Sequence, residues 1–156
     1  MNHLFIIGGI KITAFEVDHD AEGAAGYHIE NSHQKITIAT DLGQIGRRAA
    51  HYLQQSNVMV LESNYDEKML AEGPYPPYLQ ERIRSKKGHL GNHQTAEFLA
   101  NCLANNTSHV FLAHLSEHNN RSEIALRTIQ KAVGYRDSRP LVQCLPRKQR
   151  SELHRF

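Results

Sequence analysis

Four predicted strands of this chain each finish on or close to an ionisable side chain. In chain order, these side chains are His19, Asp41, Glu62 and His114. Imidazole nitrogen and carboxylate oxygen together suit Zn²⁺, Mn²⁺ or Fe²⁺, and no thiolate is needed. Because loops at the carboxyl edge of a sheet can converge on one point, we expect these side chains to form a metal site.

Histidine is the residue type that stands out in the composition, with 11 copies in 156 residues. It is the commonest metal ligand and the commonest general acid or base, so position must separate functional copies from ordinary ones. We expect five histidines to lie on exposed strand faces, loop tips or helix surfaces: His28, His33, His51, His93 and His109.

The elements that would hold the candidate site change character along the chain. The first part alternates apolar and polar residues and favours β-branched types, which predicts an antiparallel meander. The later part alternates short apolar strands with helical periodicity. The predicted strands are 11–17, 25–31, 35–40, 58–61, 109–114 and 141–145, and the predicted helices are 44–55, 66–72, 79–85, 92–106 and 120–134.

This order predicts an α/β (α+β) fold in which a mixed sheet carries helices on one face. We expect one structural domain over residues 1–135 and a basic C-terminal tail over 136–156, with one short strand in it. The tail can attract phosphate backbones or can simply be a solvated chain end. Its basic residues outnumber its acidic ones by four: Arg136, Arg139, Arg147, Lys148, Arg150 and Arg155 against Asp137 and Glu152.

Overall composition indicates a globular protein, with 40% hydrophobic residues, a net charge of +2 and a mean hydropathy of -0.54. No apolar run approaches the roughly 18 residues that span a bilayer, and the apolar stretch at the start is too short for a secretory signal. We therefore expect a cytoplasmic protein that does not enter membranes. Cys102 and Cys144 lie far apart and are expected to be free thiols.

The motifs around the candidate ligands resemble those of the metallo-β-lactamase-fold hydrolases. Within that superfamily the chain is similar to the YycJ/WalJ branch, which is related to the nucleases RNase Z and RNase J. The similarity runs from about residue 8 to about residue 134. The segments that carry it are DHDAEGAAGYHI, IATDLG, LESNYDEKML, GPYPPYLQERI, GHLGN and HLSEHNN.

The resemblance implies roles for five residues. His19 matches a histidine that binds the first metal, Asp41 matches the aspartate that bridges two metals, and His114 matches the last histidine of the second metal. His89 resembles a non-ligand histidine near the scissile phosphate, and Glu62 resembles the acid that orients it. Read without the family, His89 is equally a loop residue in front of the helix predicted at 92–106.

Further residues are candidates for substrate binding. His118 and Asn119 follow His114 closely and can contact a substrate phosphate or support the ligands, although Asn119 can equally belong to a helix cap. Arg84 lies in a basic run next to GHLGN that could hold a nucleic acid backbone. The other members of that run are Arg82, Lys86 and Lys87.

The sequence departs from the family in one respect, because it contains no HxHxDH motif. Without that motif each metal keeps only two protein ligands from this chain, fewer than the three or four of a tight site. We expect one half of the family's αββα sandwich, with an apolar sheet face left open. A separate N-terminal half or self-association would cover that face.

The leading hypothesis is a metal-dependent phosphodiester hydrolase of the nuclease or exonuclease type, using two Zn²⁺ or Mn²⁺ ions in its complete form and acting on DNA or RNA. On its own the chain should bind metal weakly and catalyse poorly. One alternative is an inert remnant or binding protein that keeps the fold. Another is a thioester or lactam hydrolase of the same superfamily.

Overall fold

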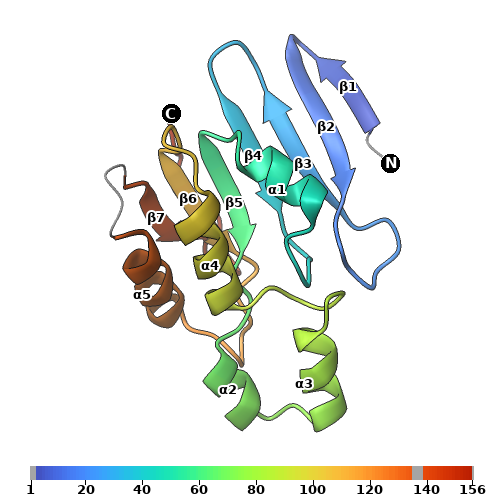
Figure 1. Ribbon diagram of the computed structural model, residues 1–156, viewed down its shortest axis with the longest axis vertical. Coiled ribbons are helices and arrows are strands. Elements are labelled where there is room, and N and C mark those ends of the chain that lie inside the picture. The colour runs from blue at the N-terminus through green and yellow to red at the C-terminus, as the bar shows by residue number, and fades with distance from the viewer. Residues whose placement is uncertain (1–2, 135–138, 156) are drawn as a thin grey trace.

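A single mixed sheet forms the centre of the computed structural model, which describes residues 3–134 and 139–155 (Figure 1). Its seven strands are hydrogen-bonded in the order in which they occur along the chain. An antiparallel meander is followed by strands that pair in parallel. The strands are β1 (His3–Ile7), β2 (Ile10–Glu16), β3 (Ala25–Glu30), β4 (Lys35–Ala39), β5 (Val58–Glu62), β6 (His109–Ala113) and β7 (Leu141–Cys144).

Helices α1 (Arg47–Leu53), α4 (Asn92–Cys102) and α5 (Ser122–Val133) lie against one face of the sheet, as predicted (Figure 1). Helices α2 (Glu67–Glu72) and α3 (Pro77–Arg84) lie beyond the edge at which β5 ends. Asp66 caps α2 by accepting a hydrogen bond from the Met69 N–H, and Pro77 opens α3. No helix in the described part of the chain is long and apolar enough to cross a membrane.

Strand β1 was not predicted. It pairs with β2 through a two-residue turn, in which Gly8 and Gly9 have φ angles of 55° and 82°. Positive φ at both central positions is the type of turn that fits the twist of a hairpin, and glycine adopts it without steric cost. The missed signal was therefore the Gly-Gly pair between two apolar runs.

The hydrophobic core lies between the sheet and helices α1, α4 and α5. Alternate residues of each strand point into it, among them Phe15, Ala39, Leu61 and Leu112, which are completely buried. His28 also lies on this face and is only 3% exposed, so the prediction that it is a surface residue was wrong. The strand alternation places His28 beside the buried Thr37, whose hydroxyl oxygen lies 2.8 Å from the His28 Nδ1.

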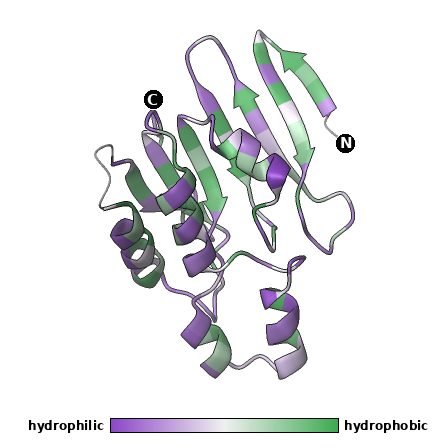
Figure 2. Ribbon diagram, viewed as in Figure 1, coloured by the Kyte–Doolittle hydropathy of each residue, from purple (hydrophilic) through white to green (hydrophobic). Residues whose placement is uncertain are grey.

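The opposite face of the sheet carries a second set of apolar side chains, which we call the open face. The register aligns Phe5 with Ile12, Ile12 with Ile29, and Ile29 with Ile36, so these side chains share one side of the sheet. Tyr27 lies on the same side. Figure 2 shows the strands coloured predominantly as hydrophobic.

Exposure on the open face differs between its two ends. Phe5 is 43% exposed and Tyr27 is 42% exposed. Phe111, on β6, is only 3% exposed because the C-terminal segment crosses that part, with the His154 ring 4.6 Å from the Phe111 ring. The predicted tail thus contributes β7 and a cover over part of this face. Its residues Arg136 and Asp137 lie outside the described residues.

Candidate metal centre

The predicted ligands meet at one edge of the sheet. Strands β2 and β4 are both antiparallel to β3, and β4, β5 and β6 are parallel, so the carboxyl ends of β2, β4, β5 and β6 share this edge (Figure 1). His19 and Asp41 stand just beyond β2 and β4, Glu62 ends β5, and His114 follows β6 directly. His89 reaches the same place from the segment that precedes α4.

Glu62 is the buried acceptor at the centre of the cluster, with none of its surface exposed. Its Oε1 accepts hydrogen bonds from His89 Nδ1 at 2.7 Å and from His114 Nδ1 at 2.9 Å. Its Oε2 accepts from the Leu42 backbone N–H at 2.8 Å. Burial alone would raise the pKa of Glu62, but these donors, His114 foremost, outweigh it and hold the pKa below its usual value. Glu62 is therefore an anion that fixes two imidazoles at once.

Three imidazole rings stand in a row at this edge. The His89 ring centroid lies 5.1 Å from that of His19 and 5.1 Å from that of His114. His19 Nδ1 donates to the Gly88 carbonyl oxygen at 2.9 Å. Since all three Nδ1 atoms are held by protein oxygens, each Nε2 is left for a metal or a substrate, as in metal sites where an oxygen orients the ligand histidine.

Asp41 lies between the outer two histidines. Its Oδ1 is 3.7 Å from His19 Nε2 and 3.6 Å from His114 Nδ1. Asp41 and His114 are the two non-glycine residues with positive φ in the described part of the chain, at 55° and 56°. Left-handed backbone costs a non-glycine residue about 1–3 kcal/mol and is concentrated at functional sites. Both strained positions in the described chain are thus predicted ligands.

Two groups of described side chains could hold an ion. In one group His19, Asp41 and His89 each offer a ligand atom within 4.8 Å of the others. In the second group the same holds for Glu62, His89 and His114. His89 belongs to both, so the geometry brings within ligand reach a histidine for which the sequence resemblance implied a non-ligand role.

Close backbone packing sets the distance between the loops that carry these residues. A Cβ at Gly43 would clash with the backbone of Ser85, Lys86 and Gly88, so only glycine lets the turn after Asp41 approach that segment. The Gly43 N–H donates to the Asp18 carbonyl oxygen at 2.9 Å. The loops that present His19, Asp41 and His89 are therefore packed directly on one another.

The predicted substrate-binding residues occupy different surroundings. His118 is exposed, and its ring lies 5.9 Å from that of Tyr75. Asn119 is completely buried, and its side-chain amide has no hydrogen-bond partner among the described residues. Arg84 pairs with Glu67 on α2, with Nε and Oε2 3.0 Å apart. Of the three, His118 alone presents an exposed side chain next to the His114 loop.

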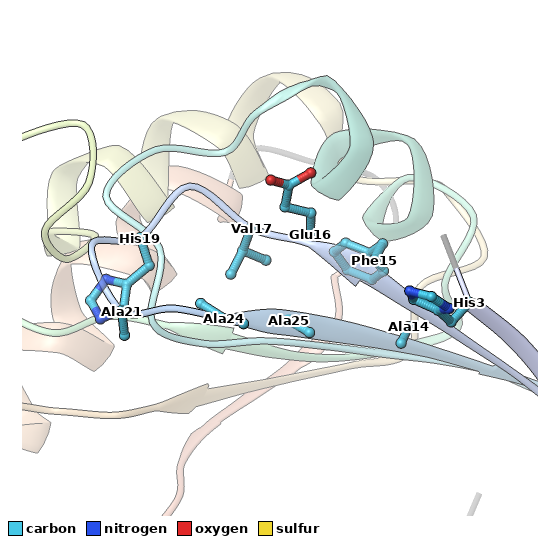
Figure 3. Close-up of a pocket in the computed structure, with 10 residues that line it drawn as sticks. His3, Ala14, Phe15, Glu16, Val17, His19, Ala21, Ala24 and Ala25 are labelled. Carbon is cyan, nitrogen blue, oxygen red and sulfur yellow. The ribbon is translucent and has the colours of Figure 1, made fainter. Parts of the chain in front are cut away.

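A hollow of about 330 Å³ adjoins the site on the side of His19 (Figure 3). Small side chains line much of it, including Ala21, Ala24 and Ala25, and His3 stands at its far end. Asp41, His89 and His114 are not part of its lining. The hollow is thus a neighbour of the ligand cluster and does not contain it.

Sequence reasoning missed a set of buried polar residues beneath the ligands, which we call the amide cluster: Ser63, Asn64, Asn92, Thr95 and Asn120. Asn92 accepts from Ser63 Oγ at 2.6 Å and donates to Asn120 Oδ1 at 3.0 Å. Thr95 Oγ1 donates to the Glu62 carbonyl oxygen at 2.7 Å. The available signal was the run of small polar residues directly after apolar strands in LESN and HLSEHNN.

The chain is similar to known proteins in sequence and in structure. The sequence model of the family described as "Beta-lactamase superfamily domain" matches residues 2–114. An exodeoxyribonuclease YycJ of Bacillus anthracis is 35% identical over 126 residues, which are 81% of this chain and 48% of that protein. An exodeoxyribonuclease WalJ of Streptococcus pneumoniae is 33% identical over 130 residues, 83% of this chain and 48% of that protein. The chain thus spans about half the length of these relatives.

Solved structures share the fold. The metallo-β-lactamase-fold protein YhfI of Bacillus subtilis superimposes with a TM-score of 0.66 at 11% identity, over 92% of this chain and 49% of that one. The short form of human tRNase Z superimposes with a TM-score of 0.53 at 18% identity, over 74% of this chain and 40% of that one. With a match over most of its length to the family and a shared fold, the chain belongs to the β-lactamase superfamily, in its metallo-β-lactamase-fold branch, with YycJ and WalJ among its relatives.

Proposed function

We propose that this chain forms one half of the site of a metal-dependent phosphodiester hydrolase that acts on nucleic acid. The observation that carries the proposal is the convergence of His19, Asp41, His89 and His114 around the buried Glu62 carboxylate. Two relatives named as exodeoxyribonucleases support a nuclease of the exonuclease type. DNA and RNA both remain substrates to be tested.

The donor set fits a divalent metal of the Zn²⁺ or Mn²⁺ kind, since it offers imidazole nitrogen and carboxylate oxygen. In the proposed arrangement His19 and Asp41 hold one ion, and Asp41 and His114 hold a second. Bound metal would act as a Lewis acid that activates water and offsets negative charge on the phosphate. The protein's part is to fix the imidazoles through Gly88 and Glu62 before any ion binds.

His89 is proposed as the group that handles the proton of the leaving oxygen. Its Nδ1–H is held by Glu62, so its Nε2 is the atom that can face a substrate. A carboxylate behind an imidazole stabilises the protonated ring, which can then donate to an oxygen that leaves phosphorus. His118, Asn119 and Arg84 remain proposed substrate contacts, with His118 best placed by its exposure.

The remaining ligands are proposed to come from a second polypeptide. Two protein donors per ion fall short of a tight site, and the open face is apolar where Phe5 and Tyr27 are exposed. A separately encoded N-terminal half would supply both the missing ligands and a cover for this face. Self-association would supply the cover alone.

Two other functions use the same fold. An inert remnant or binding protein would retain the sheet, but nothing then maintains two strained residues and a buried carboxylate bonded to two imidazoles. A thioester or lactam hydrolase would keep the metal site and differ in substrate. The exposed Lys86 and Lys87 next to the His89 segment favour a phosphate substrate over either of these.

The experiment that tests the proposal joins the N-terminal half of the Bacillus anthracis relative to this chain and supplies Mn²⁺ or Zn²⁺. We expect shortening of labelled single- or double-stranded DNA or RNA from its ends, and no turnover of lactam or thioester substrates. In that protein His89→Ala should depress turnover far more than metal content. Equal loss of both would make His89 a ligand, and hydrolysis confined to a lactam or thioester would replace the proposal.

A further inference from the structure

The amide cluster connects three of the segments that carry the site, those of Glu62, His89 and His114. Glu62 precedes Ser63 and Asn64, His89 lies shortly before Asn92, and His114 lies before Asn120. Side chains of the amide cluster are between 0% and 8% exposed. Buried polar groups need partners, and a satisfied network fixes the segments that it joins.

Asn64 and Asn120 both reach all three segments, and Asn64 is the one whose side chain bonds to the backbone of His114 itself. Its backbone N–H donates to the Leu90 carbonyl oxygen at 2.7 Å, one residue beyond His89. Its carbonyl oxygen accepts from the Ser116 N–H at 2.8 Å and from Asn120 Nδ2 at 3.0 Å. Its side-chain Nδ2 donates to the carbonyl oxygen of His114 at 2.7 Å.

That last hydrogen bond acts on a strained residue. His114 has a φ of 56°, in the left-handed region that few non-glycine residues adopt, although histidine does so more often than most. From this backbone its ring reaches Glu62 Oε1 at 2.9 Å and faces Asp41 at 3.6 Å. Another backbone conformation at His114 would move the ring relative to both carboxylates.

We propose that Asn64 is a positioning residue, whose side-chain amide holds the left-handed backbone of His114 and thereby aims the His114 ring. The inference deepens the proposed function, since it concerns a proposed ligand, but the aim of the ring can be measured without metal. The hydrogen bond described for the Asn64 side chain goes to neither Glu62 nor Asp41. It acts through the carbonyl group of His114.

The test compares two buried asparagines of the amide cluster. Asn64→Asp keeps the size of the side chain but replaces the N–H that His114 accepts by an oxygen. Asn92→Asp makes the same change in a residue whose side chain bonds to Ser63 and Asn120. General damage to the hydrogen-bond network should affect both variants, whereas a changed orientation of the His114 ring should appear in Asn64→Asp alone.

The first readout is the imidazole spectrum of the metal-free chain, observed by ¹H–¹⁵N correlation at the side-chain nitrogens. In Asn64→Asp we expect the Nδ1 signals of His114 to move, while those of His28, which bonds to Thr37, stay in place. Asn92→Asp should leave the His114 signals where they are. Unchanged His114 signals in a folded Asn64→Asp protein, or equal changes in both variants, would overturn the proposal.

The second readout is a titration with Zn²⁺ alone. Changes to groups that orient a ligand typically weaken metal binding by about 10–100-fold, so Asn64→Asp should raise the Kd for Zn²⁺ at least about tenfold. An Asn64→Asp Kd within about twofold of the wild type, in a chain that does bind Zn²⁺, would contradict the proposal. If the wild-type chain alone binds no Zn²⁺, the titration is repeated on the chain joined to the N-terminal half of the Bacillus anthracis relative. Absence of binding there would contradict the proposed metal site, while the imidazole spectrum still decides the role of Asn64.

If Asn64→Asp does not fold, the hydrogen bond between Asn64 and His114 is tested in the wild-type protein. A scalar coupling from Asn64 Nδ2 to the His114 carbonyl carbon, together with slow solvent exchange of the Asn64 amide protons, is the expected result. Asn101 is an exposed control whose amide bonds to the Glu97 carbonyl oxygen. Asn64 protons that exchange as fast as those of Asn101 would overturn the proposal.

Discussion

Asp41 Oδ1 lies 3.6 Å from His114 Nδ1, and both residues reach this position from left-handed backbone. They follow strands β4 and β6, which flank β5 and its terminal Glu62. Strain at two residues that face each other indicates a site whose geometry is maintained at a cost in stability. Replacement of Asp41 by glycine should therefore weaken metal binding while it relieves the cost of the left-handed backbone.

Asp41→Gly and Asp41→Ala separate the two effects. Both remove the carboxylate and should abolish Zn²⁺ binding. Glycine tolerates a φ of 55°, whereas alanine does not, so Asp41→Gly should be more stable than Asp41→Ala by about 1 kcal/mol. Urea denaturation of the metal-free proteins measures the difference, and equal free energies of unfolding would show that Asp41 is not strained.

Glu62→Gln should destabilise the chain by about 2–4 kcal/mol. The carboxylate accepts hydrogen bonds from His89, His114 and Leu42. An amide would place its N–H₂ group against one of these donors. The matched control is Glu67→Gln, which removes an ion pair between partly exposed groups, with Arg84. Its effect should stay below about 1 kcal/mol. Similar losses in the two variants, measured by urea denaturation, would remove Glu62 from the centre of the network.

The buried His28 should make the stability of the fold depend on pH. Burial lowers the pKa of His28 below its ordinary value of 6.5, so the unfolded chain binds a proton more readily than the folded one. Neutral His28 therefore contributes fully to the free energy of unfolding above pH 6.5. This contribution is lost as the pH falls through 6.5 toward the lower pKa of His28 in the folded chain.

His28→Phe removes the titrating group and should flatten the fall in unfolding free energy between about pH 7 and pH 5. His33→Phe, at an exposed position, should leave the wild-type slope unchanged. Denaturant titrations at several pH values supply the slopes. A His28→Phe slope equal to that of the wild type would mean that His28 does not contribute.

The exposed apolar side chains of the open face should cause copies of this chain to associate. Phe5→Glu combined with Tyr27→Glu places charge on two exposed apolar side chains of this face and should shift the chain toward monomer. Tyr78→Glu is the control, because Tyr78 is 73% exposed on α3, away from the sheet. Sedimentation velocity over a range of concentrations compares the three proteins. A wild-type chain that is monomeric throughout would leave only the separate N-terminal half as occupant.

The sheet edge was predictable because its signal is local. Each apolar strand stops at an ionisable residue, and parallel strands bring such residues together at one edge, so His19, Asp41, Glu62 and His114 could be grouped without coordinates. The helices were predictable from their apolar spacing, although α4 ends at Cys102, earlier than expected. The strand ends and the helices can each be read from the residues of one segment at a time.

What could not be predicted depends on contacts between segments. That Glu62 serves His114 as well as His89, and that Asn64 bonds to the His114 carbonyl, follows from the packing of three loops. The burial of His28 depends on which face of β3 the helices cover, which alternation alone leaves open.

The most direct test of the metal site is the loss of individual histidine resonances as Mn²⁺ is added to the metal-free chain. Bound Mn²⁺ broadens signals of nuclei close to it, so His19 and His114 should disappear first and in a saturable way, while His28 and His51 persist. Asp41→Ala should abolish the effect. Uniform broadening of all histidines, or broadening that Asp41→Ala leaves intact, would contradict a metal centre at this edge of the sheet.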